Sequence, residues 1–290
     1  MSSTASKERF ADAYIESPWP QNLNLQLETI NNSSCELKLI YSEEVNNGTG
    51  SIHGGIIASS MHDAGLMFAT QLFQSAPELS VNTIDFQISY LSAAKNSDLL
   101  VSAKLLRKTS RLAFIQIVSS DKNGNAIASV NACFGAWEEV SSNQFAKDLY
   151  LPLLSRTVKD HPFKTMMSTV IETKIAGMFI EEMGEGFCRM KLENIERYQN
   201  HSGDIALGAQ LMLTDNVGAF ASLAAIDTFG IGSTIDLKLT QCETAINENV
   251  IAVAEAMQQR GSQMSSRLMI IGEESQELKA FGAVTIWVRF

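Results

Sequence analysis

The fold is decided by one stretch, His53-Gly54-Gly55-Ile56-Ile57-Ala58-Ser59-Ser60-Met61-His62-Asp63-Ala64-Gly65-Leu66-Met67-Phe68-Ala69. After the glycines, apolar residues recur at helical spacing, which predicts a helix that is buried on most sides. Two glycines at a helix start let the backbone approach a ligand closely and leave the first N–H groups pointing outward. Such a start can bind a carbonyl oxygen or an anion. The alternative is a plain helix start at which glycine relieves crowding.

The composition is that of a globular chain with room for one large or two ordinary domains. It has 290 residues, of which 45% are hydrophobic and 19% are charged, and its formal net charge is −10. An acidic chain lacks the basic footprint that phosphate binding needs, so nucleic acid is not expected as a partner. No signal-peptide core and no apolar run of about eighteen residues occurs, so we expect a cytoplasmic protein that does not bind membranes.

Two smaller groups of residues have ordinary interpretations. The four cysteines lie in strand-like apolar surroundings without metal-ligand spacing, so free buried thiols are expected in place of disulfides or a zinc site. One local basic cluster consists of Arg107, Lys108 and Arg111. This cluster either meets the phosphates of a small cofactor or forms a solvated turn, and the sequence leaves both interpretations open.

The elements around the predicted helix are mostly strands. A short amphipathic helix is predicted at 6–16, before Ser17-Pro18-Trp19-Pro20. Alternating patterns predict a hairpin over 23–41 and further strands at 83–90, 99–106, 112–119 and 126–137. One long helix followed by antiparallel strands indicates an α+β layer in which a sheet wraps the helix.

The chain contains an internal repeat. When 153 is added to the residue number, positions 35–65 overlay 188–218 without a gap, and nine of the 31 pairs are identical. Ordinary residue usage gives roughly two such identities. With a two-residue deletion, Thr83-Ile84-Asp85 then matches Thr234-Ile235-Asp236. The sequence therefore predicts two copies of one fold.

The repeat sets the expected domain boundaries. An N-terminal domain is predicted at 1–140, a linker at 141–164 and a C-terminal domain at 165–290. The linker is expected to contain a short helix around 144–151 that Pro152 ends. Two copies of a helix wrapped in a sheet associate as a homodimer would, and a fused pair is free to differentiate. The differences between the copies therefore point to function.

The copies differ at the start of the long helix and near its middle. The first copy has His53-Gly54-Gly55 where the second has Ala206-Leu207-Gly208, so the first keeps the better carbonyl-binding turn. Farther along, His62 of the first copy corresponds to Asp215 of the second. Asp215 lies in an otherwise apolar helix, where a carboxylate needs hydrogen bonds and is a candidate base. The alternative is an aspartate that faces solvent.

These residues resemble a known family. Asn47 stands six residues before His53-Gly54-Gly55, a Thr-Ile-Asp strand ends in Ser-Tyr-Leu-Ser-Ala-Ala-Lys, and an Arg-Lys-Thr-Ser-Arg turn follows. The pattern resembles the hotdog-fold acyl-CoA thioesterases of the phenylacetate-pathway type. It extends over both copies, so the resemblance implies an α+β double hotdog, two tandem domains in each of which an antiparallel sheet wraps a long central helix. The implied activity is hydrolysis of an acyl thioester to a free acid and CoA.

The resemblance also implies one composite site. In that family, an Asn and a His-Gly-Gly turn of one subunit face an acidic residue and a Ser or Thr of the other. The corresponding residues here are Asn47, His53, Gly54 and Gly55 from the first copy and Asp215 and Thr234 from the second. The Gly54 N–H and the Asn47 amide would hold the oxyanion, and Asp215 would activate water or attack directly. Thr234 would position the water or the carboxylate, His53 would shape the loop, and Arg107, Lys108 and Arg111 would meet the CoA phosphates.

The mirror site is expected to be silent. It would combine Asn200 and the Ala206-Leu207-Gly208 turn with His62 and Thr83, and it lacks both the turn histidine and the carboxylate. Asp63 lies one residue beyond the family position. A local slip of the helix would restore it, but the ungapped match of Gly55 and Gly65 with the second copy argues against that slip.

Other functions on the same fold stay open. A non-catalytic acyl or CoA-binding protein is favoured if Asp215 faces solvent. An enoyl-CoA hydratase or dehydratase is disfavoured because His62 and Asp63 are adjacent, and a thioesterase with an Asp, Thr and Gln triad lacks its Gln in the last strand, 280–290. The resemblance implies an acyl-CoA or acyl-carrier thioester as substrate, no cofactor beyond the CoA of the substrate, no metal, and a homo-oligomer of double-hotdog chains.

Overall fold

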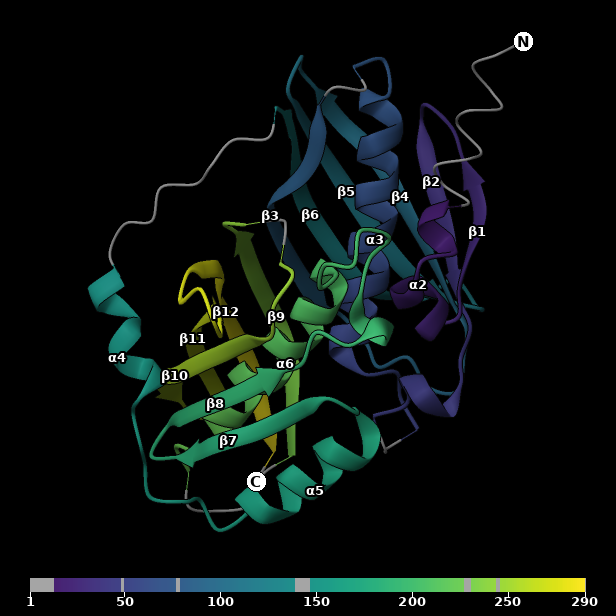
Figure 1. Cartoon of the computed structure of the whole chain (residues 1–290). Helices are drawn as coiled ribbons and strands as arrows, with labels where there is room; N and C mark the ends of the chain where they lie inside the picture. Colours follow the sequence, from purple (N-terminus) through teal and green to yellow (C-terminus); the bar gives the residue numbers. More distant parts are fainter. Residues whose placement is uncertain are drawn as a thin grey trace. The chain divides into compact units, whose positions relative to one another are not determined.

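The computed structural model describes residues 13–47, 50–76, 79–138, 147–226, 231–243 and 246–289. Contacts divide the chain into two compact units (Figure 1). Unit 1 comprises residues 1–141 and 196–209, and unit 2 comprises residues 142–195 and 210–290. The segment 196–209 therefore belongs to the second repeat by sequence and to unit 1 by contacts. The domain boundaries at 140 and 165 stay a prediction.

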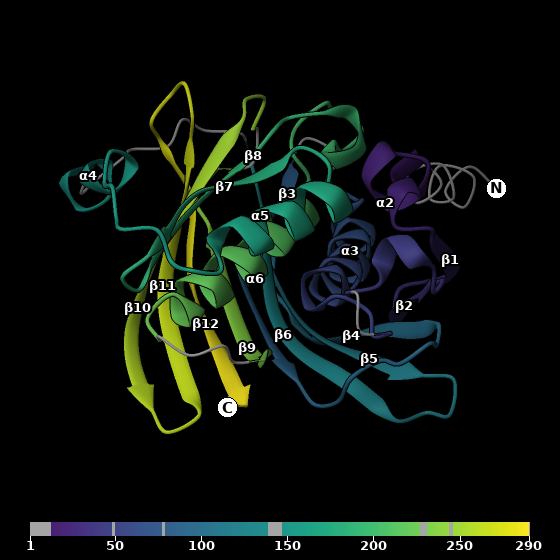
Figure 2. The same cartoon turned by 90° about the horizontal axis from the view of Figure 1, so that it is seen from below.

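Unit 1 is a six-stranded antiparallel sheet with a long helix against it. The strands follow the order β1-β2-β4-β5-β6-β3. Figure 2 shows helix α3 lying against the curved face formed by β4, β5 and β6. The element bounds are β1 Leu25–Ile30, β2 Ser34–Leu39, η1 Glu43–Val45, α3 Gly54–Phe73, β3 Ser80–Tyr90, β4 Leu99–Lys108, β5 Leu112–Asp121 and β6 Ala126–Trp137.

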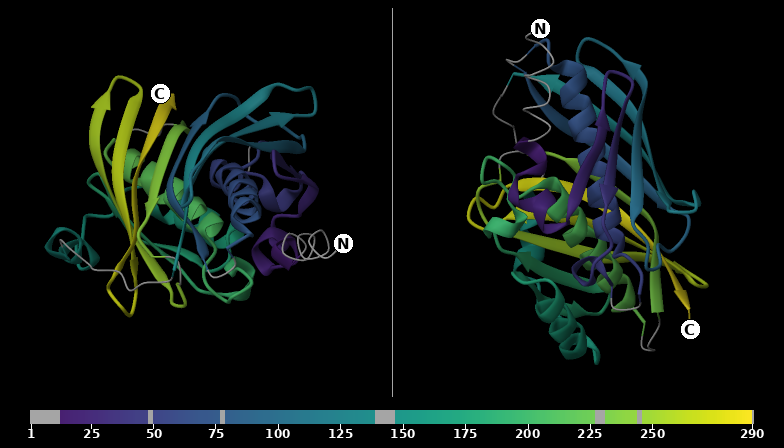
Figure 3. Two further views of the ribbon diagram at one scale, coloured as in Figure 1. Left: turned by 90° about the horizontal axis from the view of Figure 1, so that it is seen from above. Right: turned by 90° about the vertical axis from the view of Figure 1, so that its right-hand side faces the viewer.

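Unit 2 repeats this architecture with the same strand order, β7-β8-β10-β11-β12-β9. Its helix α6 lies along β11 and β12, since the Ser266 hydroxyl donates to the Gly218 carbonyl (Figure 3). The element bounds are α4 Leu151–Leu154, α5 Lys164–Lys174, β7 Met178–Gly184, β8 Phe187–Leu192, η3 Glu196–Tyr198, α6 Leu207–Leu223, β9 Ile231–Gln241, β10 Val250–Arg260, β11 Gln263–Gly272 and β12 Leu278–Arg289.

The predicted duplication is confirmed element by element. Helices α3 and α6 begin at Gly54 and Leu207, which are 153 residues apart, and β2 and β8 keep the same offset. The loop before each helix repeats as well, because Gly50 and Gly203 both have left-handed backbones, with φ of 79° and 84°. These φ values favour glycine at both positions.

Helix α3 is buried on nearly every side, as predicted. Ser60, His62 and Asp63, which lie off its apolar face, are at most 1% exposed. Close packing on the sheet explains the repeated glycine of the two helices. A Cβ at Gly65 would lie 2.7 Å from the Phe134 ring, and one at Gly218 would lie 2.6 Å from Val284.

Prolines stand at two predicted helix ends. The helix predicted at 6–16 ends at Ile15, within one residue of its predicted end, and its residues 6–12 lie outside the described part. A second helix that was not predicted, α2, begins at Pro18 and runs to Asn22. The prediction for the second helix end, at Pro152, is wrong. Pro152 does not end a helix at 144–151, since α4 begins at Leu151 and has Pro152 in its first turn. In both cases proline occupies a first-turn position, where its missing N–H costs nothing. Residues 144–146 lie outside the described part.

Helix α4 is placed by its own apolar residues. Leu151, Leu153 and Leu154 pack against a buried cluster that includes Tyr150 and Phe187. The connection between the repeats is thus partly ordered against the sheet of unit 2. Helix α5 was not predicted, and only Ile171 of its eleven residues is buried.

Candidate active site

The start of α3 has the geometry of a carbonyl-binding turn. His53 is the N-cap residue, and its Nδ1 accepts the Gly55 N–H at 3.1 Å. The N–H groups of Ile56 and Ile57 both donate to the His53 carbonyl. Among the described residues, the Gly54 N–H has no acceptor, so it is the one unpaired donor of the first helical turn. The Tyr90 hydroxyl donates to the Gly54 carbonyl at 2.9 Å and fixes the orientation of this peptide.

Asn47 lies in the loop that leads into this turn. Its backbone N–H donates to the Ser51 carbonyl at 2.8 Å, and its Oδ1 accepts the Ser51 N–H at 3.4 Å. The His53 N–H donates to the Val45 carbonyl, which ties the loop to the helix start. The structure therefore brings together the four predicted residues of the first repeat, Asn47, His53, Gly54 and Gly55. Because His53 uses Nδ1 as a helix cap, its expected role in shaping the loop is supported.

In unit 2 the structure pairs the two predicted residues of the second repeat. The Thr234 hydroxyl on β9 donates to Asp215 Oδ1 on α6 at 2.6 Å, and Asp215 is 6% exposed. The interpretation of Asp215 as a solvent-facing residue is therefore wrong. A buried carboxylate that accepts a hydrogen bond from a hydroxyl group is a chemically suitable base for water.

Unit 1 has the equivalent pair, in which a histidine takes the place of the aspartate. His62 Nε2 lies 2.8 Å from the Thr83 hydroxyl, as Asp215 lies beside Thr234. This equivalence confirms the predicted alignment of His62 with Asp215. It also excludes the helix slip that would place Asp63 in the family position, because Asp63 contacts other groups.

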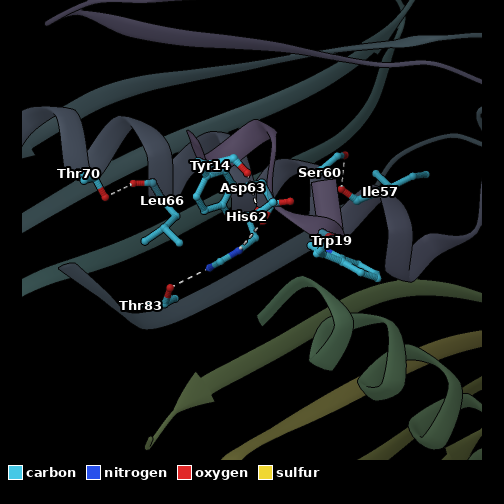
Figure 4. Close-up of polar contacts among 11 residues, drawn as sticks. Tyr14, Trp19, Ile57, Ser60, His62, Asp63, Leu66, Thr70 and Thr83 are labelled. Atoms are coloured by element: carbon cyan, nitrogen blue, oxygen red, sulfur yellow. Dashed lines mark hydrogen bonds and ion pairs between the residues drawn. The ribbon is translucent and has the colours of Figure 1, made fainter. Parts of the chain in front are cut away.

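Asp63 takes part in a buried network that the sequence did not predict. The Tyr14 hydroxyl donates to Asp63 Oδ1 at 2.8 Å, and His62 Nδ1 lies 3.3 Å from the same oxygen. Figure 4 shows Tyr14, Asp63, His62 and Thr83 linked in a chain. Burial, reinforced by the charge and hydrogen bond of Asp63, raises the pKa of Tyr14 well above its usual value. Spacing gave no signal for Tyr14, because it lies 49 positions from its partner.

The structure does not bring the basic cluster to the thioester turn. Lys108 Nζ lies 4.9 Å from the centre of the Phe73 ring, at the C-terminal end of α3. The 20 residues of α3 span about 30 Å, so Lys108 and Gly54 lie at opposite ends of the helix. Arg107 and Arg111 lie at the same hairpin, between β4 and β5, and all three side chains are exposed. The predicted contact of Arg107, Lys108 and Arg111 with the CoA phosphates, away from the thioester group, stays a prediction.

Other features of the described residues add no further group to the site. A hollow of about 250 Å³ in unit 2, between Leu149 and Phe281, is lined by none of the predicted site residues. Within the described ranges, no three His, Cys, Asp or Glu side chains are grouped to hold a metal ion. None of the helices in this part of the chain combines the length and apolar character needed to cross a membrane. All four cysteines are free thiols, and Cys35 and Cys188 are buried as expected.

Part of this chain is similar in sequence to known proteins. Residues 49–128 match the thioesterase superfamily. Human acyl-coenzyme A thioesterase 13 is 33% identical over 96 residues, which cover 32% of this chain and 65% of that protein. The chain therefore spans slightly less than two thirds of the length of this curated relative.

Solved structures match over nearly the whole chain. The TesB protein of Mycobacterium avium subspecies paratuberculosis has a TM-score of 0.65 at 10% identity and covers 98% of this chain and 100% of its own. The acyl-CoA thioesterase II TesB2 of Mycobacterium marinum has a TM-score of 0.62 at 11% identity, and the match covers 93% of this chain and 96% of that protein. At such identities the likeness shows the fold alone, and it confirms the predicted double hotdog. The phenylacetate-pathway subtype stays a prediction.

Proposed function

Since residues 49–128 match the thioesterase superfamily and the whole chain has the double-hotdog fold, we propose that this protein hydrolyses an acyl thioester. The products are a free acid and a thiol, and the proposed thiol carrier is CoA, as in the name of the human relative. The proposed site combines the Asn47 and Gly54 turn of the first repeat with Asp215 and Thr234 of the second.

The chemistry follows from the four groups. The Gly54 N–H, at the positive end of α3, and the Asn47 amide would stabilise the negative charge that develops on the carbonyl oxygen. Asp215, held by Thr234, would remove a proton from water while the water oxygen bonds to the carbonyl carbon. The carbon–sulfur bond then breaks, and the departing thiolate takes up the proton. His53 keeps the turn in shape.

The observation that carries the proposal is the buried Asp215–Thr234 pair at the position where the first repeat has His62 and Thr83. A reciprocal arrangement within unit 1 supports the pairing of one repeat's turn with the other repeat's helix. The turn that precedes α6 packs on α3, because a Cβ at Gly208 would collide with Ser59 Oγ. Ser59 lies one helical turn before His62 and Asp63. Because the two repeats correspond at an offset of 153 residues, we propose that the turn of the first repeat pairs with the helix of the second in the same way.

The test is the release of free thiol from acyl-CoAs of graded chain length. We expect hydrolysis by the unaltered chain and a loss of about 10²- to 10⁴-fold in kcat for Asp215→Asn, the usual contribution of a general base. Asp63→Asn is the matched control, because it alters a buried aspartate of the equivalent helix, and we expect its rate to change less than about twofold.

The opposite pattern, with Asp63→Asn inactive and Asp215→Asn active, would refute the composite site. Binding of acyl-CoA without hydrolysis at any chain length would instead identify a non-catalytic binding protein. Parallel assays with acyl-carrier-protein thioesters distinguish the two proposed carriers. Sedimentation would test the expected homo-oligomer.

A further inference from the structure

The N-terminal segment of the described chain is packed into unit 1. We call residues 14–23, which include α2, the N-terminal plug. Its buried residues are Tyr14, Ser17, Trp19, Pro20 and Leu23. Trp19 is 1% exposed, so the largest side chain of the plug is fully inside the unit.

The plug contacts both α3 and the turn of the second repeat. The Trp19 indole N–H donates to Ser59 Oγ at 2.9 Å, and its backbone N–H donates to the Gln199 carbonyl at 3.0 Å. The Trp19 ring lies 5.8 Å from that of Tyr198, centre to centre. A Cβ at Gly208 would collide with the Trp19 indole nitrogen, so the indole lies directly on the first turn of α6. Figure 4 shows Trp19 beside α3.

This location is the mirror of the proposed active site. The turn from Asn200 to Gly208 repeats the turn from Asn47 to Gly55 with the same left-handed glycine. His62, one helical turn beyond Ser59, stands where the second repeat has Asp215. The plug therefore lies between a helix start and a helix midpoint that correspond to the two halves of the proposed site.

Within the described residues of the second repeat, the segment that corresponds to the plug has a different character. The residues that correspond to Tyr14 and Trp19, 153 positions later, are Met167 and Glu172 of α5. Helix α5 buries Ile171 alone, whereas the plug buries two aromatic rings and donates a hydrogen bond to one oxygen of a buried aspartate. An aromatic side chain buries roughly 150–250 Å². The plug thus resembles a ligand in its size and in its mixture of apolar surface and donors.

We propose that unit 1 contains a second acyl-thioester binding site, formed by the α6 turn and α3, and that the N-terminal plug is its resident occupant. This inference rests on the proposed function. The Tyr14 and Trp19 rings take the apolar volume of an acyl chain, and their O–H and N–H groups bind Asp63 and Ser59. A tethered occupant competes at an effective concentration on the order of millimolar, so free ligand does not displace it. The intact chain then binds one ligand.

The test is the binding stoichiometry of S-hexyl-CoA, a thioether that cannot be hydrolysed, measured by titration calorimetry. We expect one equivalent per chain for the unaltered protein and two for Trp19→Ala. Ile171→Ala is the matched control, because it removes the buried residue of the corresponding segment, and it should bind one equivalent. If Trp19→Ala does not fold, the milder Tyr14→Phe/Ser59→Val variant should bind a second, weaker equivalent.

The outcomes separate the two ideas. One equivalent for the unaltered chain and for a folded plug variant overturns the second site and leaves the proposed function standing. Two equivalents for the unaltered chain overturn the plug as an occupant. No binding by any variant overturns the proposed substrate class and, with it, the inference.

Discussion

Helices α3 and α6 occupy equivalent positions in the two repeats but carry different polar groups at the same point. In α6, Asp215 accepts the Thr234 hydroxyl, and in α3 His62 contacts Thr83 while the next residue, Asp63, binds Tyr14. The threonine was kept in both repeats and the group beside it changed. The comparison shows that the duplicated scaffold keeps its packing while the polar residues of α3 contact the chain's own N-terminal residues.

The threonine pair gives the largest expected difference between the repeats. Thr234→Val removes the hydroxyl that orients Asp215, and a poorly placed base costs up to about 100-fold in kcat. Thr83→Val makes the same change in unit 1 and should leave kcat unaltered. Steady-state thiol release measures both. Equal losses for the two variants would show that both repeats contribute to turnover.

The helix glycines test whether the packing of the two repeats is equally tight. Gly218→Ala places its Cβ 2.6 Å from Val284 Cβ, which is rigid, whereas Gly65→Ala meets the ends of the Phe134 and Ile117 side chains. Overpacking costs about 1–3 kcal/mol, offset by about 1 kcal/mol of better helix propensity. We expect the free energy of unfolding, measured with urea, to fall by about 2 kcal/mol in Gly218→Ala and by less than about 1 kcal/mol in Gly65→Ala. The reverse order would contradict the packing described here.

The plug predicts that the stability of unit 1 falls at alkaline pH. The pKa of Tyr14 is raised above its usual value, about 10, so its contribution to stability is complete below pH 10 and is lost as the pH rises further. Burial also raises the pKa of Tyr198 to about 12, which adds to the loss between pH 10 and 12. Tyr14→Phe should lower the free energy of unfolding by about 1.5 kcal/mol at neutral pH, and this free energy should then decline less steeply above pH 10. Urea unfolding across this range measures it, with Tyr198→Phe for comparison.

The equivalent cysteines give the smallest expected difference. Burial raises the pKa of Cys35 to about 12 and that of Cys188 still further, so both thiols should resist iodoacetamide at pH 8.5 in the folded protein. The half-buried Cys133 and Cys242 should react first. Mass spectrometry of digested samples reports each site. Faster labelling of either buried thiol would identify the repeat that opens more readily.

The sequence predicted most of the fold because each element had its own periodicity. The strands of unit 1 and the start of α3 agree with the alternating and helical patterns, and the offset of 153 carried them to unit 2. Helix α2 was missed and the helix end at Pro152 was wrong because proline was treated only as a stop, whereas it stands in the first turn of the next helix. Apolar packing of Leu151 and its neighbours on the sheet decided that outcome.

The candidate site was predicted less completely. The turn of Asn47 to Gly55 and the Asp215–Thr234 pair follow from motif and repeat, since each is local or fixed by strand alignment. Tyr14 and Trp19 were missed because their partners are 49 and 40 positions away and no repeat links them. The role of the basic cluster stays a prediction, because a pattern along the chain does not tell which end of α3 the β4–β5 hairpin reaches.

Residues 196–209 belong to unit 1, so the first repeat would lose part of its own unit if the chain were divided between the repeats. A chain cut between the repeats would leave unit 1 without the Gln199 carbonyl that accepts the Trp19 N–H and without the Tyr198 ring beside it. A freestanding first repeat would therefore expose an unsatisfied aromatic surface and tend to aggregate. Because unit 1 includes this short loop of the second repeat, the first repeat alone is not a complete folding unit.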